Sequence, residues 1–477
     1  MLLNFILIPP VLFIFIHLLS GSKKIGFYLQ MIYGLMLVAV SAPVVFSTMS
    51  YSLSFSAIQV FHSFRIVPAY YLDGKNAPLI LMIGMIIPLI FFIMKNHLSD
   101  KGSLFYIPFN VFVLGLAGAF VSDSLIIFYF FYELSLIGAY FLIGLFGTGE
   151  KSGALTRFFL FTLTGSLAML FSIAGISAIT GSDVPLSHLS SSLQAIPPSL
   201  RLIIFSGFFL AFAVKMPLFL FHGWMRQTYA GSSPPVRAIL SAAMSKLGAY
   251  GFLIILAGSF AKEMQMLSLP LFILAAAGAL YGALLCLGAD DIFDVIVYSS
   301  LVHLSVIALG IFSGVSGNKN DLSALGGSLF QMFNHGLIMA MLFALEDKIG
   351  PRLAVTGLRG KKGRLYAVFL IAIFSSISLP GMSNFAGELI VLYSSFKVNP
   401  YITLIAGAGL LIAAAALVRS FHKLFLGKPS GGKEGDLTIP ETGLTLVMTA
   451  FWILLGIFPD VFLRSALTAL QSLRGGS

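Results

Sequence analysis

The chain has 477 residues, of which 58% are hydrophobic and only 10% are charged. This composition, with a mean hydropathy of +0.99, excludes a water-soluble globular protein, so the lipid bilayer must be the solvent for most of the surface. The net charge of +10 does not indicate a nucleic-acid-binding face, because the basic residues fall in short loops between apolar runs.

Apolar runs long enough to cross a membrane recur along the whole sequence. A transmembrane helix needs roughly 17 to 25 apolar residues, and runs of this kind predict about fourteen spans. No linker is long or polar enough to separate two domains, so residues 1–477 are expected to form a single membrane domain of the all-α polytopic class. The expected spans cover residues 3–20, 26–49, 78–94, 103–122, 124–146, 156–180, 201–222, 236–260, 267–288, 292–314, 324–345, 364–394, 402–426 and 441–463.

Lysine and arginine indicate how this domain is oriented. They concentrate in the loops on one side, which the positive-inside rule assigns to the cytoplasm. The polar segment 183–199 is expected at the opposite, outer surface. Both termini are therefore expected on the periplasmic or outer side of a bacterial or archaeal cell membrane. The loops on that side hold only Arg65, Lys75, Arg201, Lys262, Lys319 and Lys397.

Cys286 is the one cysteine in the sequence. A single cysteine excludes a disulfide framework and a cysteine-ligated metal or iron–sulfur cluster in this chain. Cys286 lies inside an apolar run, which indicates a packing role. We therefore expect no cofactor, no metal site and no catalytic redox centre. Asp290, Asp291 and Asp294 cluster at one membrane edge, where we interpret them as a solvated helix start, since acids favour a helix N-terminus.

Four ionisable residues lie deep inside expected spans: Glu133, Lys215, Lys246 and Glu388. On insertion scales each would cost about 2.5 to 3.5 kcal/mol if it faced lipid, so these residues must face protein or water. Groups of this kind usually serve proton or ion transfer, and the alternative is that they form structural salt bridges between helices. Lysine suits proton transfer because, unlike arginine, it can release its proton when its surroundings change.

Two of these charges lie close to a proline. Pro217 follows Lys215 by two residues, and Leu379-Pro380-Gly381 precedes Glu388. Proline removes a backbone hydrogen bond, and a broken helix at membrane depth is tolerated only where it lines a cavity or is buried in protein. The breaks fall in spans seven and twelve, and an odd offset of five helices reverses direction, so the pattern predicts two inverted five-helix repeats. These would be spans four to eight, about 103–260, and spans nine to thirteen, about 267–426.

Two histidines fall near mid-membrane between the buried lysines and Glu388. His303 and His335 each lie about eleven residues into their spans, and an imidazole that titrates near pH 6.5 can relay protons. The alternative is that each is a hydrogen-bonded core residue. His222, two turns after Lys215, is an accessory candidate. Neighbouring polar residues could hold water between these groups or form ordinary interhelical hydrogen bonds, namely Ser245, Tyr298, Ser299, Ser300, Asn334 and Asn384.

Several motifs around these residues resemble one family of membrane proteins. They are similar to motifs of the antiporter-like, proton-translocating subunits of respiratory complex I, of membrane-bound hydrogenases and of Mrp antiporters. The resemblance covers nearly the whole chain, at least from Glu133 to Glu388. The motifs are Phe131-Tyr132-Glu133-Leu134, Ala213-Val214-Lys215-Met216-Pro217-Leu218-Phe219 with His222-Gly223-Trp224, Ser245-Lys246-Leu247-Gly248-Ala249-Tyr250-Gly251, Tyr298-Ser299-Ser300-Leu301-Val302-His303 and His335-Gly336-Leu337.

The resemblance implies a fourteen-helix fold with inverted repeats and a role for each buried group. Glu133 would pair with Lys215, and Lys246 would be the central lysine. His303 and His335 would link Lys246 to the twelfth span. In that span Asn384-Phe385-Ala386-Gly387-Glu388 is similar to the M-type subunit of NADH-quinone oxidoreductase, which carries glutamate where several relatives carry lysine.

The chain departs from the family pattern at two places on the expected cytoplasmic edge. After Trp224 the family continues with a proline, an acid and a histidine before an acid-Ala-Pro. This sequence instead has Met225-Arg226-Gln227-Thr228-Tyr229 and later Ser233-Pro234-Pro235. At the tenth span, Phe293-Asp294 replaces the basic pair that follows Asp-Ile. The charge of this edge is therefore altered.

The expected function is that of a non-redox, proton-translocating membrane subunit of a complex I-like oxidoreductase, of the chain M or hydrogenase-linked kind. It would move H⁺ along buried glutamate, lysine and histidine. An Mrp-type Na⁺/H⁺ antiporter subunit is the alternative, and a scaffold whose charges only fix helix packing is a third interpretation. The expected partners are other membrane subunits of such a complex, the bilayer and H⁺ or Na⁺, with no nucleic acid.

Overall fold

The computed structural model describes residues 2–56, 58–61, 64–95, 97, 102–317, 322–349, 357–360, 362–426 and 435–473. Within these ranges, eleven helices are long and apolar enough to cross a membrane. Shorter apolar helices cover Asn4–Ser20, Ala77–Ile93 and Gly363–Ser376. The expected class, an all-α polytopic membrane protein, is confirmed, and every expected span contains a helix.

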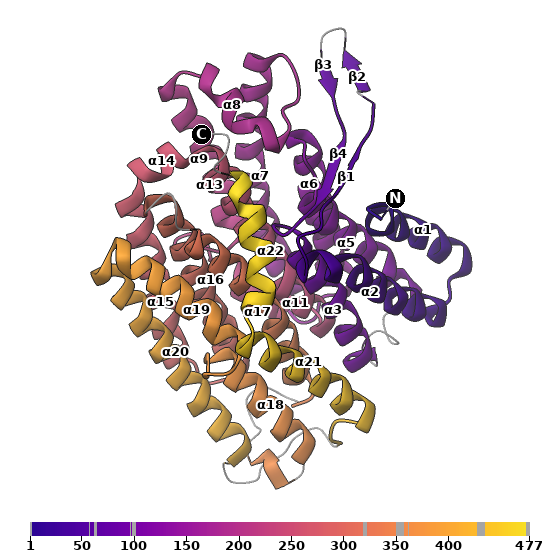
Figure 1. The fold of residues 1–477 in the computed structure, drawn as a ribbon. Helices are drawn as coiled ribbons and strands as arrows, with labels where there is room; N and C mark the ends of the chain where they lie inside the picture. Colours follow the sequence, from indigo (N-terminus) through magenta and orange to yellow (C-terminus); the bar gives the residue numbers. More distant parts are fainter. Residues whose placement is uncertain are drawn as a thin grey trace.

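The first half of the chain forms a helical bundle (Figure 1). It contains one broken span, which is interrupted between α9 and α10. A helix with two π-helical turns, made of α11 to α13, completes this half. In chain order the elements are α1 (Asn4–Ser20), α2 (Lys23–Val45), α3 (Ala77–Ile93), η1 (Ser103–Phe105), α5 (Tyr106–Val121), α6 (Leu125–Phe146), α7 (Lys151–Thr180), η2 (Leu186–His188), α8 (Leu189–Ser192), η3 (Leu193–Ala195), α9 (Pro198–Lys215), α10 (Met225–Gly231), α11 (Pro234–Ile239), η4 (Leu240–Met244), α12 (Ser245–Gly251), η5 (Phe252–Leu256), α13 (Ala257–Ser259) and α14 (Ala261–Met266).

The second half of the chain also contains a broken span. Helix α22 of this half crosses in front of the bundle in the view of Figure 1. In chain order its elements are α15 (Ser268–Gly288), α16 (Ile292–Ser316), α17 (Ser323–Asp347), η6 (Leu358–Gly360), α18 (Gly363–Ser376), α19 (Ser383–Val398), α20 (Pro400–Leu426), α21 (Ile439–Ile457), α22 (Asp460–Leu470) and η7 (Gln471–Leu473).

Several of these helices have a polar residue at the N-terminus whose side chain caps the helix. The Ser124 hydroxyl accepts a hydrogen bond from the backbone N–H of Ile127 at the start of α6. Thr438 and Glu441 form a capping box at the start of α21. Such caps satisfy N–H groups that have no partner within the helix, and they mark where an apolar run can begin to be helical.

The centre of the bundle is formed by the helix α11 to α13 together with α16 and α17, whose residues are buried along nearly their whole length by surrounding helices. Lys246, His303 and His335 lie on these central helices. By contrast, α2, α20 and α21 expose many leucine, isoleucine and tyrosine side chains on their outer faces. Lys246, His303 and His335 are therefore surrounded by protein, as their insertion cost requires.

Four short strands form a hairpin that the sequence analysis did not predict. β1 (Tyr51–Ser54) pairs antiparallel with β4 (Ala69–Leu72), and β2 (Ile58–Phe61) pairs with β3 (Phe64–Ile66). The hairpin projects beyond the helices (Figure 1). Strands of three or four residues are too short to produce a clear two-residue periodicity, which explains why sequence patterns missed them.

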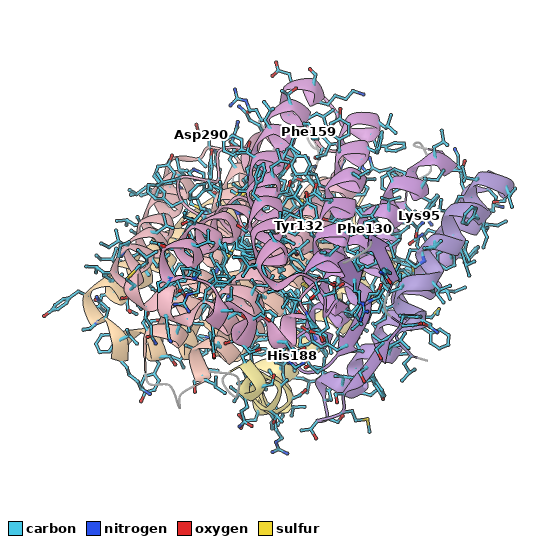
Figure 2. All side chains as sticks on the ribbon, turned by 90° about the horizontal axis from the view of Figure 1, so that it is seen from above. Lys95, Phe130, Tyr132, Phe159, His188 and Asp290 are labelled. Atoms are coloured by element: carbon cyan, nitrogen blue, oxygen red, sulfur yellow. The ribbon has the colours of Figure 1, made fainter. Side chains whose placement is uncertain are left out.

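The polar segment 183–199 folds into three short helical turns, η2, α8 and η3. It was expected at a membrane surface opposite to that of Asp290. Figure 2 shows His188, in this segment, and Asp290 toward opposite ends of the bundle. The two loops therefore lie toward different ends of the bundle, and the side of the membrane that each faces stays a prediction.

Both predicted helix breaks are confirmed. One separates α9, which ends at Lys215, from α10, and the other separates α18 from α19. At each break a backbone N–H reaches five residues back: Leu218 N donates to Ala213 O (2.9 Å), and Leu379 N donates to Phe374 O (3.0 Å). The inverted relation between spans four to eight and nine to thirteen stays a prediction.

Candidate functional site

Glu388, on α19, lies in a buried cluster of polar side chains. Its Oε1 is 2.7 Å from Nδ1 of His303 on α16. The same oxygen accepts hydrogen bonds from Gln331 Nε2 (2.9 Å) and Asn384 Nδ2 (3.1 Å). Gln331 also donates to Asn384 Oδ1 (2.6 Å). Three helices thus converge on one carboxylate oxygen, which can exchange a proton with the imidazole beside it.

The local backbone explains how this cluster can form. Asn384 and Glu388 lie four residues apart in the first half of α19, just after the break, and both contact Gln331 on α17. Gly387 allows α17 to approach, because a Cβ at that position would lie 2.6 Å from Gln331 Oε1. The motif Asn384-Phe385-Ala386-Gly387-Glu388 is therefore suited to present a carboxylate to a neighbouring amide.

His335 continues the row toward the centre of the bundle. Its ring centroid lies 5.4 Å from that of His303. Neither ring nitrogen of His335 has a hydrogen-bond partner among the described residues, although only 1% of the residue is exposed. Its ring interacts electrostatically with both Lys246 and His303. His335 is therefore a buried imidazole with two unused ring nitrogens, and it lies between two titratable side chains, those of Lys246 and His303.

Lys246 is fully buried on α12, between two π-helical turns. Its Nζ donates to Ser241 O (3.0 Å) and to Ser245 Oγ (3.2 Å). Among the described residues it has no ion pair. A π-helical turn changes the backbone hydrogen-bond pattern, and such turns are frequent at functional sites. Here the carbonyl oxygen of Ser241, in one of the turns, accepts a hydrogen bond from the ammonium group. The amine is therefore held by neutral groups that allow it to lose its proton.

Lys215 and Glu133 form a second group, at the end of α9 and on α6. Lys215 Nζ donates to Ser135 Oγ (3.1 Å) and lies 4.3 Å from the centre of the Tyr132 ring. Glu133 lies close enough to Lys215 for their charges to interact, and its Oε1 has no hydrogen-bond partner among the described residues. The structure thus brings the two expected partners into electrostatic range, with Ser135 and not Glu133 as the direct acceptor of Lys215.

His222 lies within the first helix break and packs away from this group. Its ring is 5.3 Å from that of Tyr281 on α15 and stacks on Phe219 at 6.2 Å. Its accessory role stays a prediction.

The sequence analysis missed three residues that contact these groups: Gln331, Ser135 and Tyr132. A neutral side chain carries little insertion cost and so gave no signal of its own. Gln331 could have been found by spacing, because it lies four residues before His335 and shares its helical face. Tyr132 and Ser135 lie three residues apart on α6 and also share a helical face.

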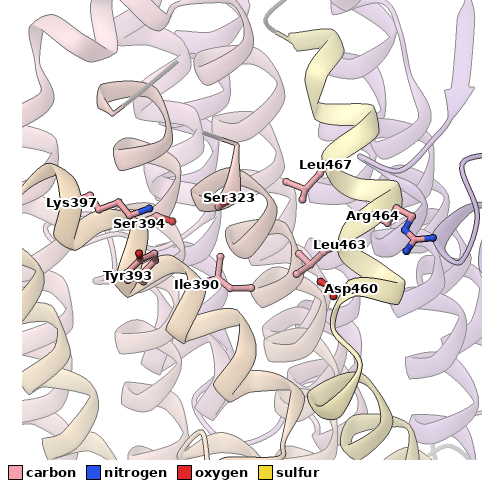
Figure 3. Close-up of a pocket in the computed structure, with 9 residues that line it drawn as sticks. All are labelled: Ser323, Ile390, Tyr393, Ser394, Lys397, Asp460, Leu463, Arg464 and Leu467. Carbon is pink, nitrogen blue, oxygen red and sulfur yellow. The ribbon is translucent and has the colours of Figure 1, made fainter. Parts of the chain in front are cut away.

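Two cavities adjoin α19, the helix that carries Glu388. One of about 600 Å³ is bordered by Glu388, His303, Ser376 and Ser378, and is otherwise lined mostly by apolar side chains of α19 and α20. The second, of about 340 Å³, lies between α19 and α22 (Figure 3). Ser394 and Lys397 form one wall of the second cavity, while the guanidinium of Arg464 points away from the other lining side chains (Figure 3). Both cavities adjoin the helix that carries Glu388.

Residues 122–413 match the family model described as NADH:quinone oxidoreductase/Mrp antiporter, TM. The chain belongs to this family. Subunit M of NADH-quinone oxidoreductase from Pseudomonas aeruginosa is 30% identical over 407 residues, which cover 82% of this chain and 78% of that protein. A chain of respiratory complex I from Thermus thermophilus superposes with a TM-score of 0.86 at 27% identity, covering 99% of this chain and 100% of that chain.

Proteins with much lower sequence identity to this chain share its fold. A chain of the Mrp complex from a Dietzia species superposes with the same TM-score of 0.86 at 16% identity, covering 99% of this chain and 97% of that chain. The fold alone therefore does not distinguish between the two branches of the NADH:quinone oxidoreductase/Mrp antiporter family.

Proposed function

We propose that this chain is an M-type, proton-translocating membrane subunit of a complex I-like oxidoreductase. The observation that carries the proposal is the buried row formed by Lys246, His335, His303 and Glu388, in which His303 Nδ1 lies 2.7 Å from Glu388 Oε1. The similarity to subunit M of Pseudomonas aeruginosa supports the choice of branch.

In this proposal each member of the row has a task at a named atom. Lys246 Nζ holds a proton among neutral acceptors and releases it toward His335. The two imidazoles, whose centroids are 5.4 Å apart, pass it to Glu388 Oε1, which Gln331 and Asn384 orient. Glu133 and Lys215 form an adjoining charge pair whose electric field acts on Lys246. The chain moves protons by changes in charge and needs no redox chemistry of its own.

An Mrp-type Na⁺/H⁺ antiporter subunit is the second candidate function, supported by the shared fold. Glu388 favours the first candidate, since this sequence carries glutamate in the twelfth span with the surrounding motif of the M type. The partners would be other membrane subunits of the parent complex. We also propose that the Asp290 end of the bundle faces the cytoplasm and that both termini face the opposite side, in accord with the distribution of lysine and arginine.

Proton flux into liposomes tests the proposal. The chain, with the subunits that co-purify with it, is reconstituted with the pH-sensitive dye pyranine inside, and flux is driven by a potassium diffusion potential with valinomycin. We expect a proton flux that is the same with and without a Na⁺ gradient. A flux that requires Na⁺ on the opposite side would favour the Mrp candidate. No flux above that of empty liposomes would contradict both candidates.

A further inference from the structure

An ion pair of unusually good geometry lies at the end of the bundle that carries Asp290. Arg226, on α10, donates from Nε to Asp294 Oδ1 and from Nη2 to Asp294 Oδ2, both at 2.7 Å. Asp294 lies in the first turn of α16. Two parallel bonds of this kind fix orientation as well as distance, which a lysine could not do. The pair therefore ties the second half of the broken seventh span to the helix of His303.

A second ion pair lies deeper at the same end. Arg237 Nη2, on α11, is 2.9 Å from Glu346 Oε2, on α17, and the two side chains are only 6% and 4% exposed. The guanidinium carbon lies 5.3 Å from the centre of the Phe293 ring, which neighbours Asp294 in the sequence. Because an isolated charge in this position would be strongly unfavourable, the deeper pair resists separation of α11 from α17.

Both pairs join the first group of spans to the second. Both bases, Arg226 and Arg237, precede Lys246 in the first half, and both acids lie on the helices of His303 and His335 in the second half. The Arg237–Glu346 pair joins the helix of Lys246 to that of His335, and the Arg226–Asp294 pair joins α10 to the helix of His303. We refer to Arg226, Asp294, Arg237 and Glu346 together as the clasp.

The clasp lies at nearly the same distance along the helix from each relay group. Lys246 is nine residues beyond Arg237, and His303 is nine residues beyond Asp294. At about 1.5 Å per residue of α-helix, His303 is about 13 Å from the clasp and His335, eleven residues before Glu346, is about 16 Å away. Lys246 lies at a similar distance, although a π-helical turn intervenes between it and Arg237. Helices tied at this end with these spacings bring the three groups to a common depth.

We propose that the clasp positions Lys246, His335 and His303 for proton transfer between the two halves of the chain. This inference rests on the proposed function. Its four members do not touch the transferred proton and act through the helices that they join. A rise of one residue along a helix displaces a side chain by about 1.5 Å, and proton transfer is sensitive to displacements of this size.

The Arg226–Asp294 contact joins positions that are far apart in the sequence. The two residues are separated by 68 positions, yet their side chains bind each other through two hydrogen bonds.

Charge reversal in the pyranine liposomes tests the clasp. We expect Arg226→Asp and Asp294→Arg each to lower proton flux per folded chain about tenfold and to alter its pH profile, because displacing the relay groups changes which transfer limits the rate. The double reversal restores the pair with opposite polarity and should return flux to within about twofold of the wild type. Arg364→Asp is the matched control, since the Arg364–Asp436 pair has similar exposure (48% and 20%, against 49% and 18%) but does not join the relay helices.

Thermal unfolding of each purified variant shows how much chain is folded, and Glu346→Gln offers a nearly isosteric test of the deeper pair if a charge reversal prevents folding. One outcome is that the single variants differ from the wild type only in the yield of folded protein, with the same flux per folded chain and the same pH profile. That result would show that the clasp is only a structural contact and would overturn the inference. A folded double reversal that stays as slow as the single variants would also overturn it. The variant Lys246→Met separates the two proposals. Full flux in this variant would contradict the proposed function. Loss of flux in Lys246→Met together with normal flux in the clasp variants would contradict only the role of the clasp.

Discussion

His303 Nδ1 and Glu388 Oε1 lie 2.7 Å apart, although their helices α16 and α19 are separated by two other helices in the sequence. Both residues are almost fully buried, with 3% and 5% of their surface exposed. An imidazole and a carboxylate at this distance can share a proton without a bridging water. The contact makes the twelfth span the end of the row that begins at Lys246.

Replacement of Glu388 tests this end of the row. Glutamine keeps the shape and the hydrogen bonds but cannot carry the proton, so Glu388→Gln should block translocation. Glu388→Asp should retain part of it, since a shortened carboxylate still titrates but reaches less far toward His303. Glu388→Lys, which imitates several relatives, should be partly tolerated. Proton uptake by inverted membrane vesicles reports these effects, and full uptake by Glu388→Gln would remove the residue from the pathway.

Gln331 should matter for rate because it orients Glu388. Gln331→Leu removes the donor to both Glu388 and Asn384, so we expect a loss of stability of about 1 to 3 kcal/mol and a fall in flux of about tenfold. Ser328→Ala, on the same helix, removes a hydroxyl that bonds only backbone carbonyls and serves as the control. Equal flux in the two variants would show that Glu388 does not need this amide.

Glu133 and Lys215 should be energetically coupled. An unpaired charge in a low dielectric is less favourable than removal of both charges, so the double variant Glu133→Gln/Lys215→Met should lose less activity than the sum of the single variants. Because Lys215 bonds Ser135 directly, we expect the coupling to be moderate, about 1 kcal/mol. A double-mutant cycle on flux measures it. Strictly additive effects would show that the two residues act independently.

Asp436, outside the membrane spans, should give the fold a dependence on pH. It accepts backbone N–H bonds from Arg364 and Leu365 at the start of α18, each at 2.8 Å, and another from Leu437. Burial alone would raise the pKa of this carboxyl, but these donors and the charge of Arg364 hold its pKa below the ordinary value. The ionised Asp436 side chain therefore contributes to the free energy of unfolding near neutral pH, and this contribution is lost as the pH falls through the lowered pKa of Asp436.

The Asp436→Asn variant measures that contribution. We expect it to unfold about 0.5 to 1 kcal/mol more easily at pH 7, a modest effect because the site is partly screened by solvent. The difference from the wild type should shrink as the pH is lowered below about 4, where the wild-type carboxyl begins to be protonated. Thermal unfolding in detergent at several pH values checks this, and a difference that is constant with pH would contradict the assignment.

Features with a large energetic cost could be predicted from the sequence. Charges within apolar runs, such as Lys246, and prolines within expected helices, such as Pro217, are energetically unfavourable and therefore stand out in a sequence. The structure buries Lys246 and interrupts the helix just before Pro217. The expected spans follow from the same reasoning, because a long apolar run is tolerated in few other environments.

Features that depend on distant partners could not be predicted in this way. Gln331 carries no charge, and its importance appears only when α19 is packed against α17. The departures at Arg226 and Asp294 were visible separately, but their mutual contact requires the tertiary fold. The two π-helical turns around Lys246 also have no local sequence signal that distinguishes them from α-helix.

The most direct test of the relay is the proton flux of Lys246→Met, measured per folded chain in pyranine liposomes beside the wild type. Methionine fills a similar volume without a titratable group, so the helix should stay packed while the central proton carrier is lost. We predict that flux falls to the level of empty liposomes while the thermal unfolding temperature stays close to that of the wild type. A folded Lys246→Met variant that conducts protons at the wild-type rate would contradict the account.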